Sequence, residues 1–241
     1  MKRKTSTKPT KKIRTDKKAF VIGITGSIGM GKTTVGKMFA DLGIPVNNAD
    51  HDVHEALAPG GAAVAEVGKL VPDALKQDEN GQNYIDRTVL AAQVFADLDD
   101  LSLLDSLEKI LHPVVGKLRE DFVAEQAAKG HNIIVCDIPL LFETGLEKDM
   151  DMTLCVSAPA DVQRQRVLAR PFMTEEKLET VLNRQIPDAE KRKKADRVLD
   201  TSETQEQTRK KVEKLVQDIR KGAVIPKQSR KSGVRNGHGR G

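Results

Sequence analysis

Apolar residues gather along this chain in short, nearly continuous runs that are bounded by glycine or polar residues. The runs occupy residues 19–25, 44–50, 132–138, 150–157 and 195–201. Runs of this length, rich in Val and Ile, are typical of strands buried on both faces of a parallel sheet. The pattern therefore predicts a sheet built from five such strands.

Between most of these runs, apolar residues recur at a spacing of three and four. The stretch 33–43 places Val35, Met38 and Phe39 on one face and ends at Gly43, a common stop for a helix. Comparable patterns predict helices over residues 161–171, 174–185 and 202–221. Strands that alternate with helices indicate an α/β fold, with a five-stranded parallel sheet flanked by helices.

One interval in this alternation is too long for a simple crossover between strands. About 80 residues separate the second run from the third, whereas a crossover needs only about a dozen. The interval contains a turn at 78–83 and helical patterns at 86–95 and 103–130, with no strong strand signal. We expect a helical insertion over residues 51–131. Open α/β sheets bind ligands at the carboxyl edge of their strands, so the insertion is placed to bind a substrate, although a structural elaboration would show the same pattern.

Charge sets the two ends of the chain apart from the rest. Residues 1–18 carry nine Lys or Arg and one acid, and residues 222–241 carry five and no acid. The remaining chain has 26 basic and 34 acidic residues, a formal charge of −8, although the whole chain is at +5. We expect disordered basic tails around a folded part at 19–221, and no specific binding of nucleic acid.

The cysteine and hydropathy patterns limit the cellular locations that we expect for this protein. Cys136 and Cys155 lie inside apolar runs, where buried, reduced thiols are expected rather than a disulfide or metal site. No apolar stretch is long enough to span a membrane, and the basic start lacks the apolar segment of a secretory signal. We expect a cytoplasmic protein that is a monomer or a small homo-oligomer.

The segment between the first strand and the first helix matches G-x-x-x-x-G-K-[ST]. It runs from Gly26 to Thr33, and its position between strand and helix is the context in which this pattern binds phosphate. Backbone N–H groups of such a loop cradle an anion, while Lys32 reaches the β- and γ-phosphates and the Thr33 hydroxyl can ligate Mg²⁺. The motif predicts binding of ATP with magnesium.

Two aspartates end predicted strands and are candidates for the chemistry. Asp137 follows the run IIVC and is placed to hold Mg²⁺, or alternatively to cap the next turn. Asp50 ends the run IPVNNA and could accept a proton from an acceptor hydroxyl. The other interpretation of Asp50 is an N-cap for the helix that follows, and both roles are compatible.

Arginines gather over residues 160–194, where a lid would lie. They are Arg164, Arg166, Arg170, Arg184 and Arg192. Mobile cations of this kind neutralise a phosphoryl group in transfer, although a charged helix paired with neighbouring glutamates has the same composition. His51 and His54 resemble a metal pair by spacing, but without further ligands a solvated helix face is favoured.

The chain resembles the dephospho-CoA kinase family. The resemblance rests on GITGSIGMGKTT (23–34), LGIPVNNAD (42–50), LEKILHPVV (107–115), VCDIPLLFE (135–143) and KADRVLD (194–200), in the order found in that family. It implies a P-loop kinase that phosphorylates the ribose 3′-hydroxyl of dephospho-CoA with ATP and Mg²⁺, the last step of coenzyme A synthesis. The Asn48 position, often aspartate in the family, leaves one carboxylate where two are usual.

The resemblance also implies roles for single residues. Asp50 falls on the catalytic base, and Arg87 and His112 fall in the substrate-binding insertion. Arg184 falls in the lid and is expected to contact the acceptor. The groups expected to bind ATP are Gly29, Met30, Gly31, Lys32, Thr33, Thr34, Arg166 and Arg170.

Three other functions are compatible with a phosphate loop. A nucleoside-monophosphate or sugar kinase would share the architecture and differ in its acceptor. A GTP-dependent switch would need a guanine-reading N-K-x-D, which the sequence lacks. A nucleic-acid-associated ATPase could use the basic tails, but the acidic folded part argues against a duplex-binding surface.

Overall fold

The computed structural model describes residues 19–96 and 100–224 of the 241-residue chain. The predicted parallel sheet is present, with the strand order β2-β5-β1-β6-β7 and parallel register between all neighbours. Its strands are β1 (Phe20–Thr25), β2 (Val46–Asn48), β5 (Ile133–Asp137), β6 (Met152–Ser157) and β7 (Arg197–Asp200). The two predicted tails, apart from residues 222–224, lie outside the described residues.

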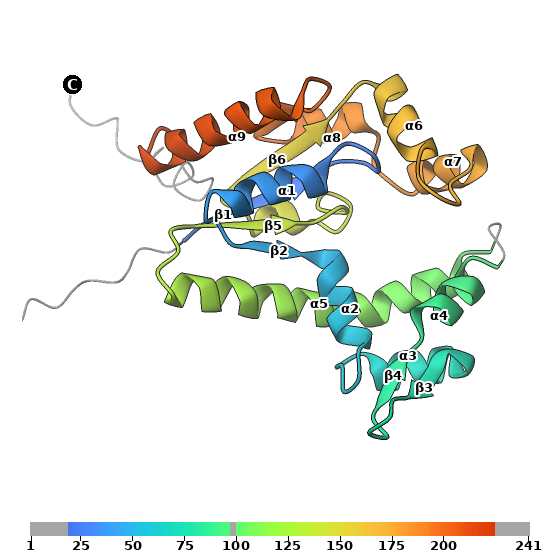
Figure 1. Cartoon of the computed structure of the whole chain (residues 1–241). Helices are drawn as coiled ribbons and strands as arrows, with labels where there is room; N and C mark the ends of the chain where they lie inside the picture. Colours follow the sequence, from blue (N-terminus) through green and yellow to red (C-terminus); the bar gives the residue numbers. More distant parts are fainter. Residues whose placement is uncertain (1–18, 97–99, 225–241) are drawn as a thin grey trace, which may run out of the picture.

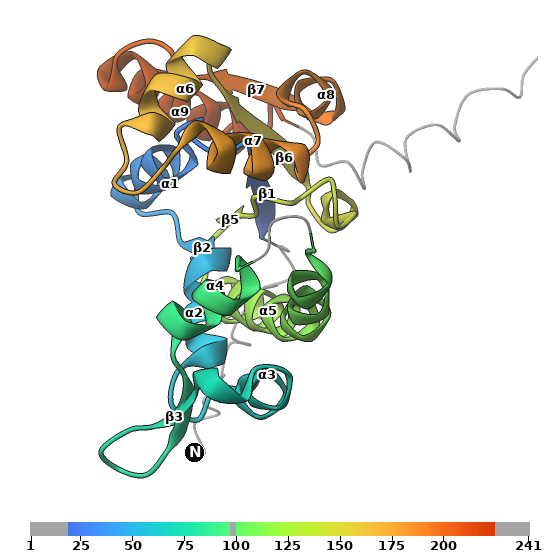
Figure 2. The same ribbon diagram turned by 90° about the vertical axis from the view of Figure 1, so that its right-hand side faces the viewer.

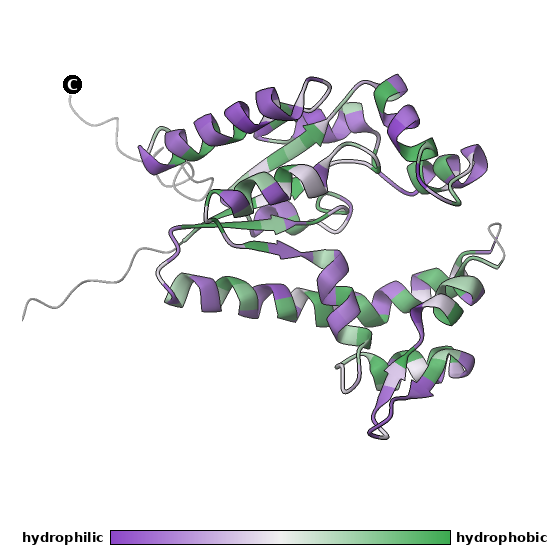
Figure 3. Ribbon diagram, viewed as in Figure 1, coloured by the Kyte–Doolittle hydropathy of each residue, from purple (hydrophilic) through white to green (hydrophobic). Residues whose placement is uncertain are grey.

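Each face of the sheet is covered by a different set of helices (Figure 1). On one face, α1 (Lys32–Asp41) and α9 (Gln205–Arg220) pack on side chains such as Ile22 and Leu154, and α9 begins with a Thr204 capping box. On the other face lie Val21 and Cys136, against the long helix α5 (Ser102–Ala128) and its Val123. Figure 3 shows the strands mainly in the hydrophobic colour and the outer helices in alternating colours, as burial on both faces of the sheet requires.

The segment between β2 and β5 folds around an apolar core of its own. It contains α2 (Ala49–Leu57), α3 (Val64–Leu70), α4 (Arg87–Val94) and α5, with the short helix η1 (Pro72–Ala74). Their buried side chains, among them Leu57, Val67 and Leu90, form a cluster separate from the sheet's core. The helical insertion predicted from the sequence is confirmed as a feature of the fold.

The prediction missed a small hairpin inside this insertion. Strands β3 (Leu75–Gln77) and β4 (Asn83–Ile85) pair antiparallel around the turn predicted at 78–83, where the Asp78 carboxylate accepts from the Asn80 and Gln82 amides. Each strand has three residues and those of β3 are exposed. Three residues are too few for a period of two to be recognised in a sequence.

The region from 160 to 194 is largely helical and lies in the upper part of Figure 2, at the opposite end of the view from α3 and the β3–β4 hairpin. The helices α6 (Ala160–Leu168) and α7 (Glu175–Asn183) were predicted, and α8 (Asp188–Lys194) was not. The sequence of α8, DAEKRKK, has no apolar period by which it could be recognised. A further short helix, η2 (Leu146–Lys148), precedes β6. Within the residues described, no helix combines the length and apolarity that a membrane span requires.

Candidate active site

The phosphate loop connects β1 to α1 in a conformation that requires glycine. Gly29 has φ 76°, and Gly26, with φ 149°, lies so near β6 that an added Cβ would stand 2.2 Å from the Val156 carbonyl oxygen. A side chain at Gly26 would therefore collide with backbone rather than with a movable group. The Lys32 Nζ donates to the Gly26 carbonyl at 2.8 Å, which holds the lysine across the loop.

A cavity of about 450 Å³ opens beside this loop, at the carboxyl ends of β1, β2 and β5. It brings together groups that are far apart in the sequence, as expected at this edge of a parallel sheet. Its lining includes Gly29, Gly31, Lys32, Thr33, Thr34, Asn48, Asp50, Asp137, Arg166 and Arg170. Most of the residues predicted for nucleotide, metal and proton chemistry therefore border one space.

Three charged side chains in this cavity influence one another. Burial raises the pKa of Asp137 to about 6, the nearby Lys32 ammonium opposes this shift, and the Asp50 carboxylate adds to it. Burial likewise lowers the pKa of Lys32, while Asp137 and Asp50 act to raise it. The coupling places two carboxylates around one ammonium group, in a site where burial makes each uncompensated charge costly. Such a site favours a ligand that brings both negative charge and a counter-cation.

The position of Asp50 is set by the residue two places before it. The Asn48 side chain caps α2, accepting from the Asp50 amide at 2.9 Å and the His51 amide at 3.1 Å. The interpretation of Asp50 as the N-cap is therefore wrong, since Asn48 takes that role and leaves the Asp50 carboxylate exposed on the first turn. Below this turn, buried Asn47 donates to both carboxylate oxygens of Asp52, which ties β2 to α2.

The donor set beside Lys32 fits Mg²⁺. The Asp137 Oδ1 atom is buried without a hydrogen-bond partner, and the Thr33 hydroxyl borders the same cavity. Among the described residues no group of three or more His, Cys, Asp or Glu could hold a metal ion. This composition suits Mg²⁺, which uses one or two protein ligands and completes its shell with phosphate oxygens and water.

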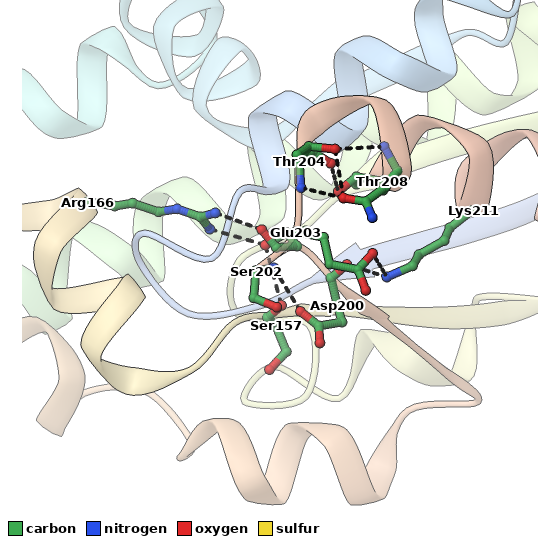
Figure 4. A network of polar contacts seen from close by, with 10 residues as sticks. Ser157, Arg166, Asp200, Ser202, Glu203, Thr204, Thr208 and Lys211 are labelled. Atoms are coloured by element: carbon green, nitrogen blue, oxygen red, sulfur yellow. Dashed lines mark hydrogen bonds and ion pairs between the residues drawn. The ribbon is translucent and has the colours of Figure 1, made fainter.

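Four of the five predicted lid arginines lie in four different environments, and the fifth, Arg192, is exposed on α8. Arg166 donates to the Thr201 hydroxyl at 3.2 Å and its carbonyl at 2.6 Å, joining α6 to the loop after β7 (Figure 4). Arg170 borders the cavity and is exposed. Arg184 lies outside the cavity lining and pairs with Asp105 and Glu108 of α5. Arg164 pairs with Glu175, so the charged-helix interpretation describes that residue.

Besides Arg184, three more predicted residues lie away from the cavity lining. Met30 is 2% exposed, and its sulfur accepts a hydrogen bond from the Ala158 backbone amide. Its side chain therefore links the phosphate loop to the residue that follows β6. His112 is exposed on α5, and its side chain makes no hydrogen bond or ion pair within the part of the chain that the structure describes. Arg87, at the start of α4, contacts His54 of α2.

The prediction missed two polar residues that support the site. Thr201 borders the cavity, donates to the Met30 carbonyl and accepts from Arg166. Lys191 is completely buried, where its Nζ pairs with Glu143 at 2.8 Å and donates to the Pro139 carbonyl at 3.0 Å. A lysine in the charged stretch EKRKK gives no sequence signal of burial, because its partners come from a loop about 50 residues earlier.

Comparison with known proteins agrees with this geometry. The family model described as dephospho-CoA kinase matches residues 20–207. A dephospho-CoA kinase of Novosphingobium aromaticivorans is 47% identical over 201 residues, covering 83% of this chain and 95% of that protein. One of Rhizobium etli is 44% identical, covering 83% and 93%. The solved structure of dephospho-CoA kinase from Campylobacter jejuni, 24% identical, superposes with a TM-score of 0.62 over 84% of this chain and 98% of that one.

Proposed function

We propose that this chain, which belongs to the dephospho-CoA kinase family and phosphorylates dephospho-CoA with ATP, transfers the phosphoryl group to the ribose 3′-hydroxyl. We also propose a separate role in this reaction for each of the cavity residues described below. The observation that carries the assignment is the meeting of Lys32, Asp137 and Asp50 in one cavity at the carboxyl ends of three strands. A phosphate loop accounts for the donor, and Asp50, which borders the same cavity from the first turn of α2, accounts for an alcohol acceptor.

The donor side binds and polarises ATP. Backbone N–H groups from Gly29 to Thr34 surround the phosphates, with the positive end of α1 behind them. The Lys32 ammonium, which donates to the Gly26 carbonyl, has further N–H groups with which it contacts the β- and γ-phosphates. The Thr33 hydroxyl and Asp137 would hold Mg²⁺, which when bound draws negative charge off the γ-phosphate.

The acceptor side supplies the base. Asp50 orients the acceptor hydroxyl toward the γ-phosphate and receives its proton as the oxygen–phosphorus bond forms and ADP leaves. The Asn48 cap holds the first turn of α2, which fixes the backbone position of Asp50. Asp50 is the one carboxylate of α2 that borders the cavity in the described part of the chain, so it can act as the base without a second aspartate at position 48.

The arginines of the lid complete the site. Arg166 and Arg170 approach the transferring group from α6 and the turn after it, and exclude water that would otherwise act as the nucleophile. Arg184 joins the lid to α5 of the insertion, whose helices α2 to α5 we call the acceptor wall, so that lid and acceptor wall are in contact. Arg87 and His112 belong to the acceptor wall and are assigned to the substrate beyond the ribose.

The test is an assay of ADP release against a panel of acceptors. We expect turnover with dephospho-CoA and little with nucleoside monophosphates or simple sugars, and phosphorus NMR of the product should place the new phosphate on the ribose 3′-oxygen. ADP release with a sugar or nucleotide but not with dephospho-CoA would contradict the assignment. A cytoplasmic location, the absence of specific nucleic-acid binding and a monomeric or small homo-oligomeric state remain predictions from the sequence.

A further inference from the structure

An arginine and a histidine meet on the insertion without an acidic partner. The Arg87 Nη1 atom lies 2.5 Å from His54 Nδ1, and the residues come from α4 and α2. A guanidinium can only donate a hydrogen bond, so Nδ1 accepts and the proton of the neutral ring is on Nε2. The remaining N–H groups of Arg87 and the His54 Nε2–H have no hydrogen-bond partner among the described residues, and both residues are exposed.

Within the described part of the chain, Arg87 lacks the ion pairs that Arg164 and Arg209 make, as exposed Arg192 and Arg197 also do, and it differs from all four because its guanidinium contacts an imidazole. Arg164 pairs with Glu175, and Arg209 pairs with Asp41. Among the residues that the structure describes, no carboxylate lies within ion-pair distance of Arg87. A cation held against a neutral ring keeps its full charge available to an anion from outside.

The place of this pair along α2 gives the anion an identity. His54 lies four residues after Asp50, so both project from the same face of α2, about one helical turn of 5.4 Å apart. Dephospho-CoA carries a diphosphate on the 5′ carbon of the ribose whose 3′-hydroxyl reacts. The path from O3′ through C3′, C4′, C5′ and O5′ to the first phosphorus also spans about one helical turn.

We propose that His54 and Arg87 form the subsite that binds the 5′-diphosphate of the acceptor while Asp50 holds its 3′-hydroxyl. The inference rests on the proposed function. It adds a second contact to the acceptor, between its diphosphate and the pair formed by His54 and Arg87. Two anchors one turn apart on a helix align a ribose, where one would let it rotate. Arginine and imidazole N–H groups suit phosphate oxygens, and charge-assisted bonds of this kind are the stronger ones.

A purely structural role for the contact is the competing interpretation. The apolar cluster that includes Leu57, Val67 and Leu90 already joins α2, α3 and α4. An exposed polar contact adds little to such a core. Removing either side chain should therefore leave the thermal unfolding temperature almost unchanged, and this measurement separates the two roles.

The first experiment compares steady-state constants of the full-length enzyme. For Arg87→Ala we expect KM for dephospho-CoA to rise by about ten- to a hundredfold, as for the loss of a hydrogen bond to a charged group, with KM for ATP unchanged and kcat altered much less. Lys76→Ala, which removes an exposed cation from β3 of the same insertion, is the control and should match the wild type. An unchanged KM for dephospho-CoA in Arg87→Ala would overturn the proposal.

The second experiment uses a substitution that only an anion site tolerates. His54→Ala should raise KM for dephospho-CoA several-fold, whereas His54→Arg should restore it to the wild-type value or below, because two cations facing each other are stabilised by a diphosphate between them. If His54→Arg is as impaired as His54→Ala, the contact is structural and the subsite is refuted. If the wild type turns over dephospho-CoA and these variants have the same KM, only the subsite is refuted. A wild type that does not use dephospho-CoA refutes the proposed function and the subsite together.

Discussion

The sheet side of the site, here called the donor wall, and the insertion side, the acceptor wall, are built in opposite ways. On the sheet side, functional groups follow buried strands: Asp137 is 6% exposed, and Lys32 is bonded to its own loop. On the insertion side, Asp50, His54 and Arg87 are exposed on short helices and are held by a cap or by each other. On the sheet side Lys32 contacts its own loop, whereas on the insertion side the Arg87 and His54 side chains hydrogen-bond only to each other among the described residues, and we propose the substrate as their further partner.

The cores beneath the walls explain this difference. The sheet core includes Ile22 and Phe39 at 0% exposure, and the insertion has a separate cluster around Val67. Because the clusters are separate, the insertion can adjust to an acceptor without disturbing the packing behind the phosphate loop. Many kinases bind the same triphosphate, which suits a rigid phosphate loop, whereas the acceptor differs from one kinase family to another.

Removing the loop lysine should give the largest effect. We expect Lys32→Ala to lower turnover by about a thousandfold, since a preorganised charge next to the transferring group is lost. The unfolding temperature should stay near that of the wild type, and Lys37→Ala, an exposed lysine one turn later on α1, should be fully active. Wild-type turnover in Lys32→Ala would refute the assignment of the donor wall.

Neutralising the proposed base should come next. Asp50→Asn should lower kcat by about a hundredfold, within the usual contribution of a positioned base, and leave the affinity for ATP unchanged. Glu55→Gln, on the same helix, serves as control because Glu55 lies outside the phosphate cavity. Unchanged turnover would remove Asp50 from the base role and shift the chemistry to the donor wall.

Removing the cap of α2 should have a smaller effect on the acceptor wall. Asn48→Ala leaves the Asp50 and His51 amides without their acceptor, at a cost of about 1 kcal/mol. We expect a lower unfolding temperature and roughly fivefold slower turnover from a less ordered Asp50. Asn48→Asp keeps an acceptor at the cap and should preserve both properties; equal loss in both variants would show that the cap does not direct Asp50.

Separating the lid from the insertion should have a weaker effect still. Arg184→Ala removes the ion pairs with Asp105 and Glu108, which at 29% exposure of the arginine add less than about 1 kcal/mol to stability. We expect KM for dephospho-CoA to rise about threefold as the lid loses its contact with the acceptor wall. Arg164→Ala breaks a pair within the lid and should not change this KM. An equal change in both variants would assign the effect to lid stability.

The smallest effect is expected from the thiols of the sheet. Burial raises the pKa of both Cys136 and Cys155 to about 12, and both are free and fully buried. Iodoacetamide at pH 8 should leave the native enzyme unlabelled and active, and should label both thiols after unfolding in guanidinium chloride. Rapid labelling of the native enzyme would show that the donor wall opens more readily than its packing indicates.

The sheet and the phosphate loop could be predicted from neighbouring residues, since buried strands show as apolar runs and the loop is one unbroken stretch from Gly26 to Thr33. The family could be recognised because several such local motifs follow one another in order over residues 23–200. The sequence also predicted that an insertion interrupts the sheet, because its length exceeds any simple crossover. These features are local, so a linear pattern is enough to recognise them.

Tertiary structure alone decided which residues meet. Asn48 rather than Asp50 caps α2, Lys191 is buried against Glu143, and Arg87 reaches His54 across 33 positions of sequence. The hairpin β3–β4 and helix α8 are also set by what packs beside them rather than by their own periodicity. Contacts between distant segments depend on how helices pack and turn in space, and a charged side chain has the same appearance in a sequence whether it faces water or a partner.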